Sequence, residues 1–148
     1  MSEAIVRILE NKVLIIAVIT WFIAQASKVI TVLITKRRFD FAPLLSSGGM
    51  PSAHSAMVTS LATAVGKYDG WSSSIFGLAA VFALVVMYDA AGVRRAAGKQ
   101  AELLNQIVDH IYHHRRDRTQ EKLKELLGHT PVEVVAGAIL GIGLGLLL

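Results

Sequence analysis

The feature that most constrains this chain is a run of 22 mostly apolar residues at positions 13–34. At a rise of 1.5 Å per residue, a helix of that length crosses the roughly 30 Å hydrocarbon core of a bilayer. Three further apolar segments follow at 53–66, 75–93 and 131–148, and the first of these is short and carries Ser and Thr. A short helix is tolerated where its end is buried in protein or lines a wet cavity. The sequence therefore predicts an all-α, polytopic membrane helix bundle of about four transmembrane helices, with residues 1–148 forming a single integral membrane domain.

The distribution of charge supports this class. Hydrophobic residues make up 53% of the chain and charged residues 18%, whereas soluble domains average about 25% charged residues. Residues 94–128 hold eight of the 15 Lys and Arg, while the apolar segments are almost free of charge. The absence of Cys excludes disulfides, zinc-thiolate sites and thiol catalysis. We expect no nucleic-acid partner, because membrane orientation also accounts for the net charge of +4.

The basic segments predict an orientation. Lys36, Arg37 and Arg38 follow the first apolar segment, and the basic region 94–128 lies between the third and the fourth. A chain with four spans puts both on one side, which the positive-inside rule assigns to the cytoplasm. We therefore expect a multi-pass protein of the cell membrane with both termini outside. Apolar residues spaced by three and four predict an amphipathic helix over 96–112, packed under the bundle. These residues are Ala97, Ala101, Leu104, Val108 and Ile111.

This topology brings four polar clusters to the cytoplasmic end of the bundle. Ionisable residues at membrane depth are costly, so a functional role is the default hypothesis for them. The first cluster lies on the first apolar segment, where Lys28 needs a partner or an anion; the others begin or end the remaining segments. The members are Gln25, Lys28 and Lys36; residues 46–55; Asp89, Arg94, Arg95 and Lys99; and residues 128–133.

The second cluster reads Ser-Ser-Gly-Gly-Met-Pro-Ser-Ala-His-Ser over 46–55. Its glycines allow backbone N–H groups to turn inward, and a helix is predicted to begin at about residue 51 or 52. The start of a helix offers unpaired donors and a positive dipole end, which suit a phosphate. His54 would lie in the first turn. Ordinary capping by Ser52, with His54 merely polar, is the alternative.

The fourth cluster contains His129 and Glu133, which stand four residues apart. A carboxylate at this spacing could orient an imidazole for nucleophilic or general-base catalysis. The same residues also fit a capping box, because Thr130 and Glu133 have its spacing and Pro131 takes the first helical position. The spacing leaves both roles open.

The third cluster has two interpretations. On a helix, Arg95 and Lys99 share a face and could clamp an anion. Alternatively, the basic residues are snorkelling anchors paired with Asp89. Asp89 is also one candidate partner for Lys28, whereas anchoring of the topology is favoured for Lys36.

Two further patterns bear on cofactors and assembly. His110, His113 and His114 lack acidic or Cys partners at metal-binding spacing and adjoin several Arg residues, so we expect no metal and no cofactor. Near the C-terminus, small residues repeat every four positions and predict close helix packing, either within the bundle or in a homo-oligomer. These residues are Gly137, Gly141 and Gly145.

The run Gly-Gly-Met-Pro-Ser-Ala-His-Ser at 48–55 resembles the Pro-Ser-x-His motif of type 2 phosphatidic acid phosphatases and vanadium haloperoxidases. Three further runs add to it: Tyr-Asp-Ala-Ala-Gly-Val-Arg-Arg at 88–95, Gly-Lys-Gln-Ala at 98–101 and Gly-His-Thr-Pro at 128–131. The resemblance covers the chain from residue 25 to about 141, and the chain looks like a divergent, short branch of that superfamily.

The resemblance implies a role for each matching residue. His54 resembles the general acid, His129 the nucleophile and Glu133 the acid that orients it. The Ser52 side chain and the backbone near Gly49 would hold phosphoryl oxygens. Lys28 or Lys36 would stand for the Lys of the first motif. Position 123 is Leu where the family has Arg, so a nearby cation would have to supply that charge. The candidates are Arg94, Arg95 and Lys99.

The resemblance also implies an activity. We expect a metal-independent lipid phosphate phosphatase that works through a phosphohistidine at the cytoplasmic interface. Its substrate would be a phosphomonoester such as phosphatidylglycerol phosphate, phosphatidic acid or a polyprenyl phosphate. The alternative is a non-catalytic membrane protein that binds anionic lipid head groups and scaffolds a partner through residues 94–128. A transporter would need polar residues along a whole transmembrane path, whereas here they gather at one end.

Overall fold

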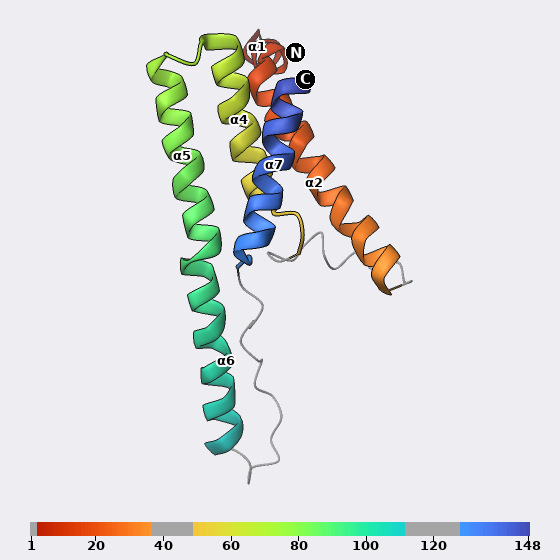
Figure 1. Ribbon diagram of the computed structural model, residues 1–148, viewed down its shortest axis with the longest axis vertical. Coiled ribbons are helices and arrows are strands. Elements are labelled where there is room, and N and C mark those ends of the chain that lie inside the picture. The colour runs from red at the N-terminus through yellow and green to blue at the C-terminus, as the bar shows by residue number, and fades with distance from the viewer. Residues whose placement is uncertain (1–2, 37–48, 112–127) are drawn as a thin grey trace.

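A computed structural model describes residues 3–36, 49–111 and 128–148 (Figure 1). These residues form helices joined by short turns and contain no strand, so the predicted all-α fold is confirmed. The helices are α1 (Glu3–Glu10), α2 (Lys12–Lys36), α4 (Ala53–Asp69), α5 (Ser74–Ala91), α6 (Val93–Ile111) and α7 (Pro131–Leu147). Both termini lie at the same end of the bundle as the α4–α5 turn (Figure 1). The starts of α4 and α7 lie at the other end of these helices.

Helix α4 is the centre of the bundle, because it packs against α2, α5 and α7. Its Ser and Thr side chains are buried, and two of them donate to carbonyls of the preceding turn: Thr59 Oγ1 to Ser55 O at 2.8 Å, and Ser60 Oγ to Met57 O at 2.9 Å. In a membrane every polar group needs such an internal partner. The Ser and Thr that make this segment a weak membrane span by hydropathy therefore suit it to the protein-covered centre.

The glycines of α7 pack against α4. A Cβ added at Gly137 would overlap the Ser52 carbonyl, and one at Gly141 would overlap Thr59 Oγ1 and the Ala56 carbonyl. Of the two roles that the sequence allows for this face, the structure shows packing within the bundle. A homo-oligomer stays a prediction, while within one chain this face lies against α4.

Two stretches are long and apolar enough to cross a membrane, namely Lys12–Leu33 with 22 residues and Ser74–Val108 with 35 residues. Helix α7 is apolar but shorter, and α4 and α7 have 17 residues each. The described helices thus form a membrane-type bundle, and the number of four spans stays a prediction.

Helix α6 continues the direction of α5 and projects away from the other helices (Figure 1). The helical hydrogen bonds run through the junction, where Gly92 N donates to Tyr88 O at 2.9 Å and Ala96 N to Gly92 O at 2.9 Å. Among the described elements, α6 contacts only α5. A helix over 96–112 is thus present at 93–111, but its predicted packing under the bundle is wrong, because no turn at Gly92 folds it back. His113, His114, Leu123 and the rest of 112–127 lie outside the described residues, as do Arg37 and Arg38.

Helix α1 was not expected from the sequence. Asn11 separates it from α2, because the Asn11 side chain accepts a hydrogen bond from Leu14 N at 3.0 Å and so caps the start of α2. Asn is among the strongest capping residues, and this was the available signal. Helix α1 lies at the opposite end of the bundle from the starts of α4 and α7 (Figure 1).

Candidate active site

His129 joins the start of α7 to the end of α5, because its backbone N–H donates to the Ala90 carbonyl at 3.0 Å. Its side chain is 2% exposed. Nδ1 lies 3.2 Å from Glu133 Oε2, whereas the buried Nε2 has no hydrogen-bond partner among the described residues. A carboxylate beside Nδ1 fixes the proton there and leaves the lone pair of the neutral ring on Nε2. The ring is therefore held through one nitrogen, and the lone pair on the other is unused among the described residues.

Glu133 combines both roles that its spacing allows. Its Oε2 accepts from Thr130 N at 2.9 Å, and Thr130 Oγ1 accepts from Glu133 N at 3.3 Å, which completes a capping box. The same Oε2 faces His129 Nδ1. The Glu133 carbonyl in turn accepts from Ser52 N at 3.0 Å. One residue thus caps α7, orients His129 and ties the start of α4 to the start of α7.

The first turn of α4 places His54 beside His129. The two ring centroids are 6.5 Å apart, with 60° between the ring planes. His54 is exposed, while Ser52 is fully buried as the helix cap. Ser52 Oγ accepts from Ser55 N at 3.3 Å and from Ser55 Oγ at 3.0 Å. The capping role predicted for Ser52 as an alternative is therefore confirmed, and His54 stands at the open side of the site.

Among the described residues, Lys28 and Arg94 are cations whose charges act on both imidazoles. Lys28 is 3% exposed on α2, and its Cδ would lie 3.8 Å from a Cβ placed at Gly49. Asp89 is not its partner, because Asp89 Oδ2 pairs with Arg94 Nε at 2.7 Å. Lys28 forms no ion pair within the described ranges. The negative charge of Glu133 acts on it without a direct contact. A buried ammonium is costly unless a ligand or counter-charge compensates it.

The comparison with known proteins identifies the family. Residues 9–144 match the sequence model of a family described as the divergent PAP2 family. The chain belongs to the divergent PAP2 family. It is also 41% identical over 152 residues to the uncharacterized membrane protein YuiD of Bacillus subtilis (strain 168), with 96% of each chain covered. No solved structure matches it. The resemblance predicted from the four motifs is thus confirmed, and so is the membrane class.

The remaining candidate residues of this divergent PAP2 protein are exposed, partly buried or outside the described side chains. Arg95 and Lys99 are exposed on α6, so the structure does not bury them in the site. Gln25 is partly buried one turn before Lys28. Lys36 ends α2, and its side chain lies outside the described residues. Gly49 is exposed with a φ of +96°.

Sequence reasoning missed Gly128 as a structural part of the site. Its φ is +94°, and a Cβ there would overlap the backbone of Arg94 and Arg95. This close approach lets the start of α7 lie against the α5–α6 junction, where His129 reaches Ala90. The signal was a Gly directly before the His-Thr-Pro run, at a position where a left-handed conformation ends a turn.

The burial of His129 predicts a pH-dependent stability. Burial lowers the pKa of His129, the hydrogen bond to Glu133 partly opposes this, and the charges of Lys28 and Arg94 lower it further. The unfolded chain, with a His pKa of about 6.5, then takes up the proton before the folded protein does. We expect stability to fall as the pH falls from about 6.5 toward the folded pKa.

The thermal midpoint in detergent at pH 7.5 and pH 5.5 measures this effect. His129→Gln removes the titrating group, so the variant is expected to lose less of its midpoint between the two pH values than the wild type. An equal loss in both proteins would show that His129 is not held neutral by the fold.

Proposed function

We propose that this divergent PAP2 protein is a membrane-embedded, metal-independent phosphatase of lipid phosphates that works through a phosphohistidine on His129. One observation carries the proposal: a buried imidazole whose Nδ1 is held by Glu133 and whose Nε2 has no partner among the described residues. A structural His would use both nitrogens, because an unpaired buried polar atom is costly. The unpaired Nε2 suits a nucleophile that meets its electrophile only when substrate binds.

In the first step, His129 Nε2 attacks phosphorus and forms the N–P bond while the bond from phosphorus to the lipid oxygen breaks. His54, in its protonated form, gives a proton to the leaving oxygen, so a lipid alcohol departs. The two ring centroids are 6.5 Å apart, so both imidazoles would act on the same phosphoryl group. Glu133 stabilises the positive charge that develops on the His129 ring.

In the second step, water attacks the phosphohistidine and the N–P bond breaks. His54, now neutral, accepts a proton from that water, and inorganic phosphate is released with His129 restored. The two steps regenerate both imidazoles and consume one water. Because His54 is exposed, its position at the open side suits proton exchange with water.

The negative charge on the phosphoryl oxygens would be stabilised by fixed groups around the rings. Lys28 is buried without an ion pair among the described residues, and Arg94 lies close enough for its charge to act on both imidazoles. The start of α4 adds its positive dipole end, set by the Ser52 cap beside Gly49. Arg95 and Lys99 would act from the rim. By the positive-inside rule this end faces the cytoplasm, in the cell membrane.

Vanadate and a chelator test the metal-free mechanism. Purified protein in detergent is expected to release phosphate from a panel of phosphatidic acid, phosphatidylglycerol phosphate and a polyprenyl phosphate in the presence of EDTA. Vanadate mimics the five-coordinate state and is expected to inhibit, because sites complementary to a transition state bind its mimics tightly. Activity that EDTA abolishes would contradict the mechanism.

A second function is favoured by one observation, the projection of α6. Its apolar side chains Leu103, Leu104 and Ile107 are 59%, 50% and 49% exposed. An exposed apolar face on a projecting helix could hold a partner, which fits a non-catalytic scaffold that binds anionic lipids. A folded wild type that releases no phosphate from the panel, yet binds anionic vesicles in an α6-dependent way, would favour this function.

A further inference from the structure

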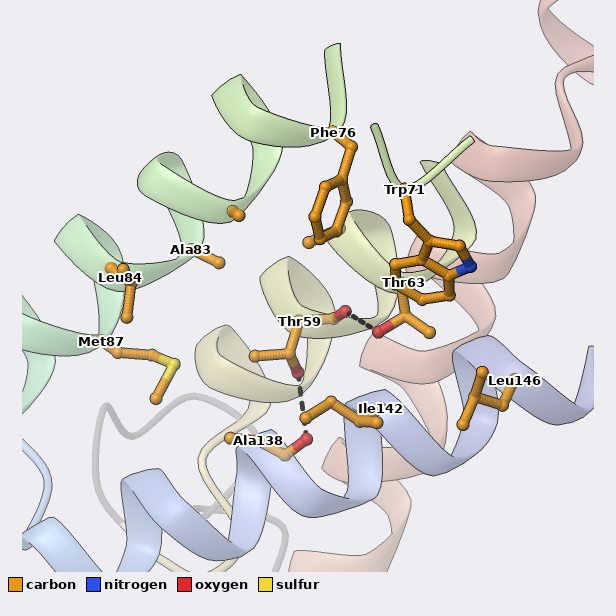
Figure 2. A pocket seen from close by; sticks show the side chains of 12 residues that line it. Thr59, Thr63, Trp71, Phe76, Ala83, Leu84, Met87, Ala138, Ile142 and Leu146 are labelled. Atoms are coloured by element: carbon orange, nitrogen blue, oxygen red, sulfur yellow. Dashed lines mark hydrogen bonds between the residues drawn. The ribbon is translucent and has the colours of Figure 1, made fainter. Parts of the chain in front are cut away.

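An apolar groove of about 430 Å³ lies between α4, α5 and α7 (Figure 2). Helices α5 and α7 both pack on α4 and touch each other little, so the groove opens between them. Its volume is in the range of pockets that bind small molecules. The side chains that mark its ends and sides include Trp71, Phe76, Met87, Ala138, Ile142 and Leu146.

The walls of the groove are almost entirely apolar. Its two hydroxyls are already bonded to carbonyls: Thr59 Oγ1 donates to Ser55 O at 2.8 Å and lies 3.2 Å from Ala138 O, and Thr63 Oγ1 donates to Thr59 O at 2.8 Å (Figure 2). A polar ligand would lose its hydrogen bonds to water without replacement. The chemistry of the walls therefore selects hydrocarbon.

The groove runs away from the candidate active site along α7. Ala138 is five residues beyond Glu133, and Leu146 is 13 residues beyond it. At 1.5 Å per residue, the groove begins about 8 Å from Glu133 and ends about 20 Å from it. Trp71 and Phe76 lie at this far end, where their ring centroids are 5.1 Å apart. On α5, Met87 precedes by three residues the Ala90 carbonyl that holds His129.

We propose that this groove binds the hydrocarbon chain of the lipid phosphate whose head group lies at His129, and that it favours chains long enough to reach Trp71 and Phe76. The inference rests on the proposed function and adds where the hydrocarbon chain of the substrate binds and which chain lengths are favoured.

A groove-filling variant tests the chain site through turnover. Ala80 lines the groove and is partly buried, whereas the neighbouring Val81 is 59% exposed and does not line it. Ala80→Phe is expected to lower phosphate release from a phosphatidic acid with two 16-carbon chains by about tenfold. This is the effect expected when about two methylene groups of the bound chain lose their burial in the groove. Release from the eight-carbon analogue should change less than twofold. Val81→Phe, the matched control, should leave both unchanged.

A second measurement does not depend on turnover. A phosphatidic acid with a photoreactive diazirine at the end of a 16-carbon chain is added to His129→Gln, and the labelled peptides are mapped by mass spectrometry. We expect labels near Trp71, Phe76 and Leu146, and fewer labels from the matching diacylglycerol, which lacks the phosphate.

The outcomes separate this inference from the proposed function. Labelling of the groove that depends on the phosphate supports the chain site even where the wild type releases no phosphate. Equal labelling by the diacylglycerol, labels spread over outward positions such as Leu78, or cross-linked dimers would overturn the chain site. So would equal losses with both chain lengths in Ala80→Phe, even in an active phosphatase.

Discussion

Replacement of His129 by Gln is expected to lower phosphate release from lipid phosphates by at least about 10³-fold, as for loss of a nucleophile from a group of residues that act together. Gln can still donate to Glu133 Oε2, so the link that now spans 3.2 Å is conserved. It cannot accept a phosphoryl group in place of Nε2. The variant therefore separates chemistry from folding.

The measurement is phosphate release together with trapping of the labelled intermediate. Wild type quenched during turnover should carry phosphate in an acid-labile, alkali-stable linkage, and His129→Gln should carry none. His54→Gln is expected to lose about 10²- to 10⁴-fold, as for a general acid, with less intermediate formed. His110→Gln, an exposed His on α6, is the control and should keep full activity. Activity retained by His129→Gln would exclude the phosphohistidine.

The convergence of the site could be predicted because membrane helices alternate in direction. Once the apolar segments are counted, the end of α2, the start of α4, the end of α5 and the start of α7 must share one side. The contacts of His129 with Ala90 and of Ser52 with Glu133 show how this happens. The pairing of Lys28 was not predictable, because spacing leaves both an anion and Asp89 open, and only the geometry shows that Asp89 pairs with Arg94.

Other features depend on geometry that residue patterns do not carry. The apolar stripe of α6 predicts a helix, but its direction depends on whether the chain turns at Gly92, where helical hydrogen bonds in fact continue. The glycine repeat of α7 predicts close packing without naming the partner, which the overlap at Gly141 identifies as α4. The groove arises from the separation of α5 and α7 across α4, a relation among three segments far apart in sequence.

Two glycines of α7 predict stability changes of opposite sign. A Cβ at Gly141 would overlap Thr59 Oγ1 and the Ala56 carbonyl, and backbone cannot move aside cheaply. Gly141→Ala is therefore expected to destabilise the fold by about 1–3 kcal/mol, as overpacking does. Gly143 has open space within 4 Å of its Cβ position. Gly143→Ala is expected to stabilise by about 0.5 kcal/mol, because Ala restricts the unfolded chain.

Thermal midpoints of the two variants in one detergent, read by tryptophan fluorescence, test this prediction. The substitutions are chemically identical, lie two residues apart and leave the charge unchanged, so detergent and helix propensity affect both alike. The difference in sign therefore reports the contact between α7 and α4. A Gly141→Ala protein as stable as Gly143→Ala would show that α7 does not lie this close to α4. That result would also remove the support for His129, since α7 begins two residues after it and carries Glu133.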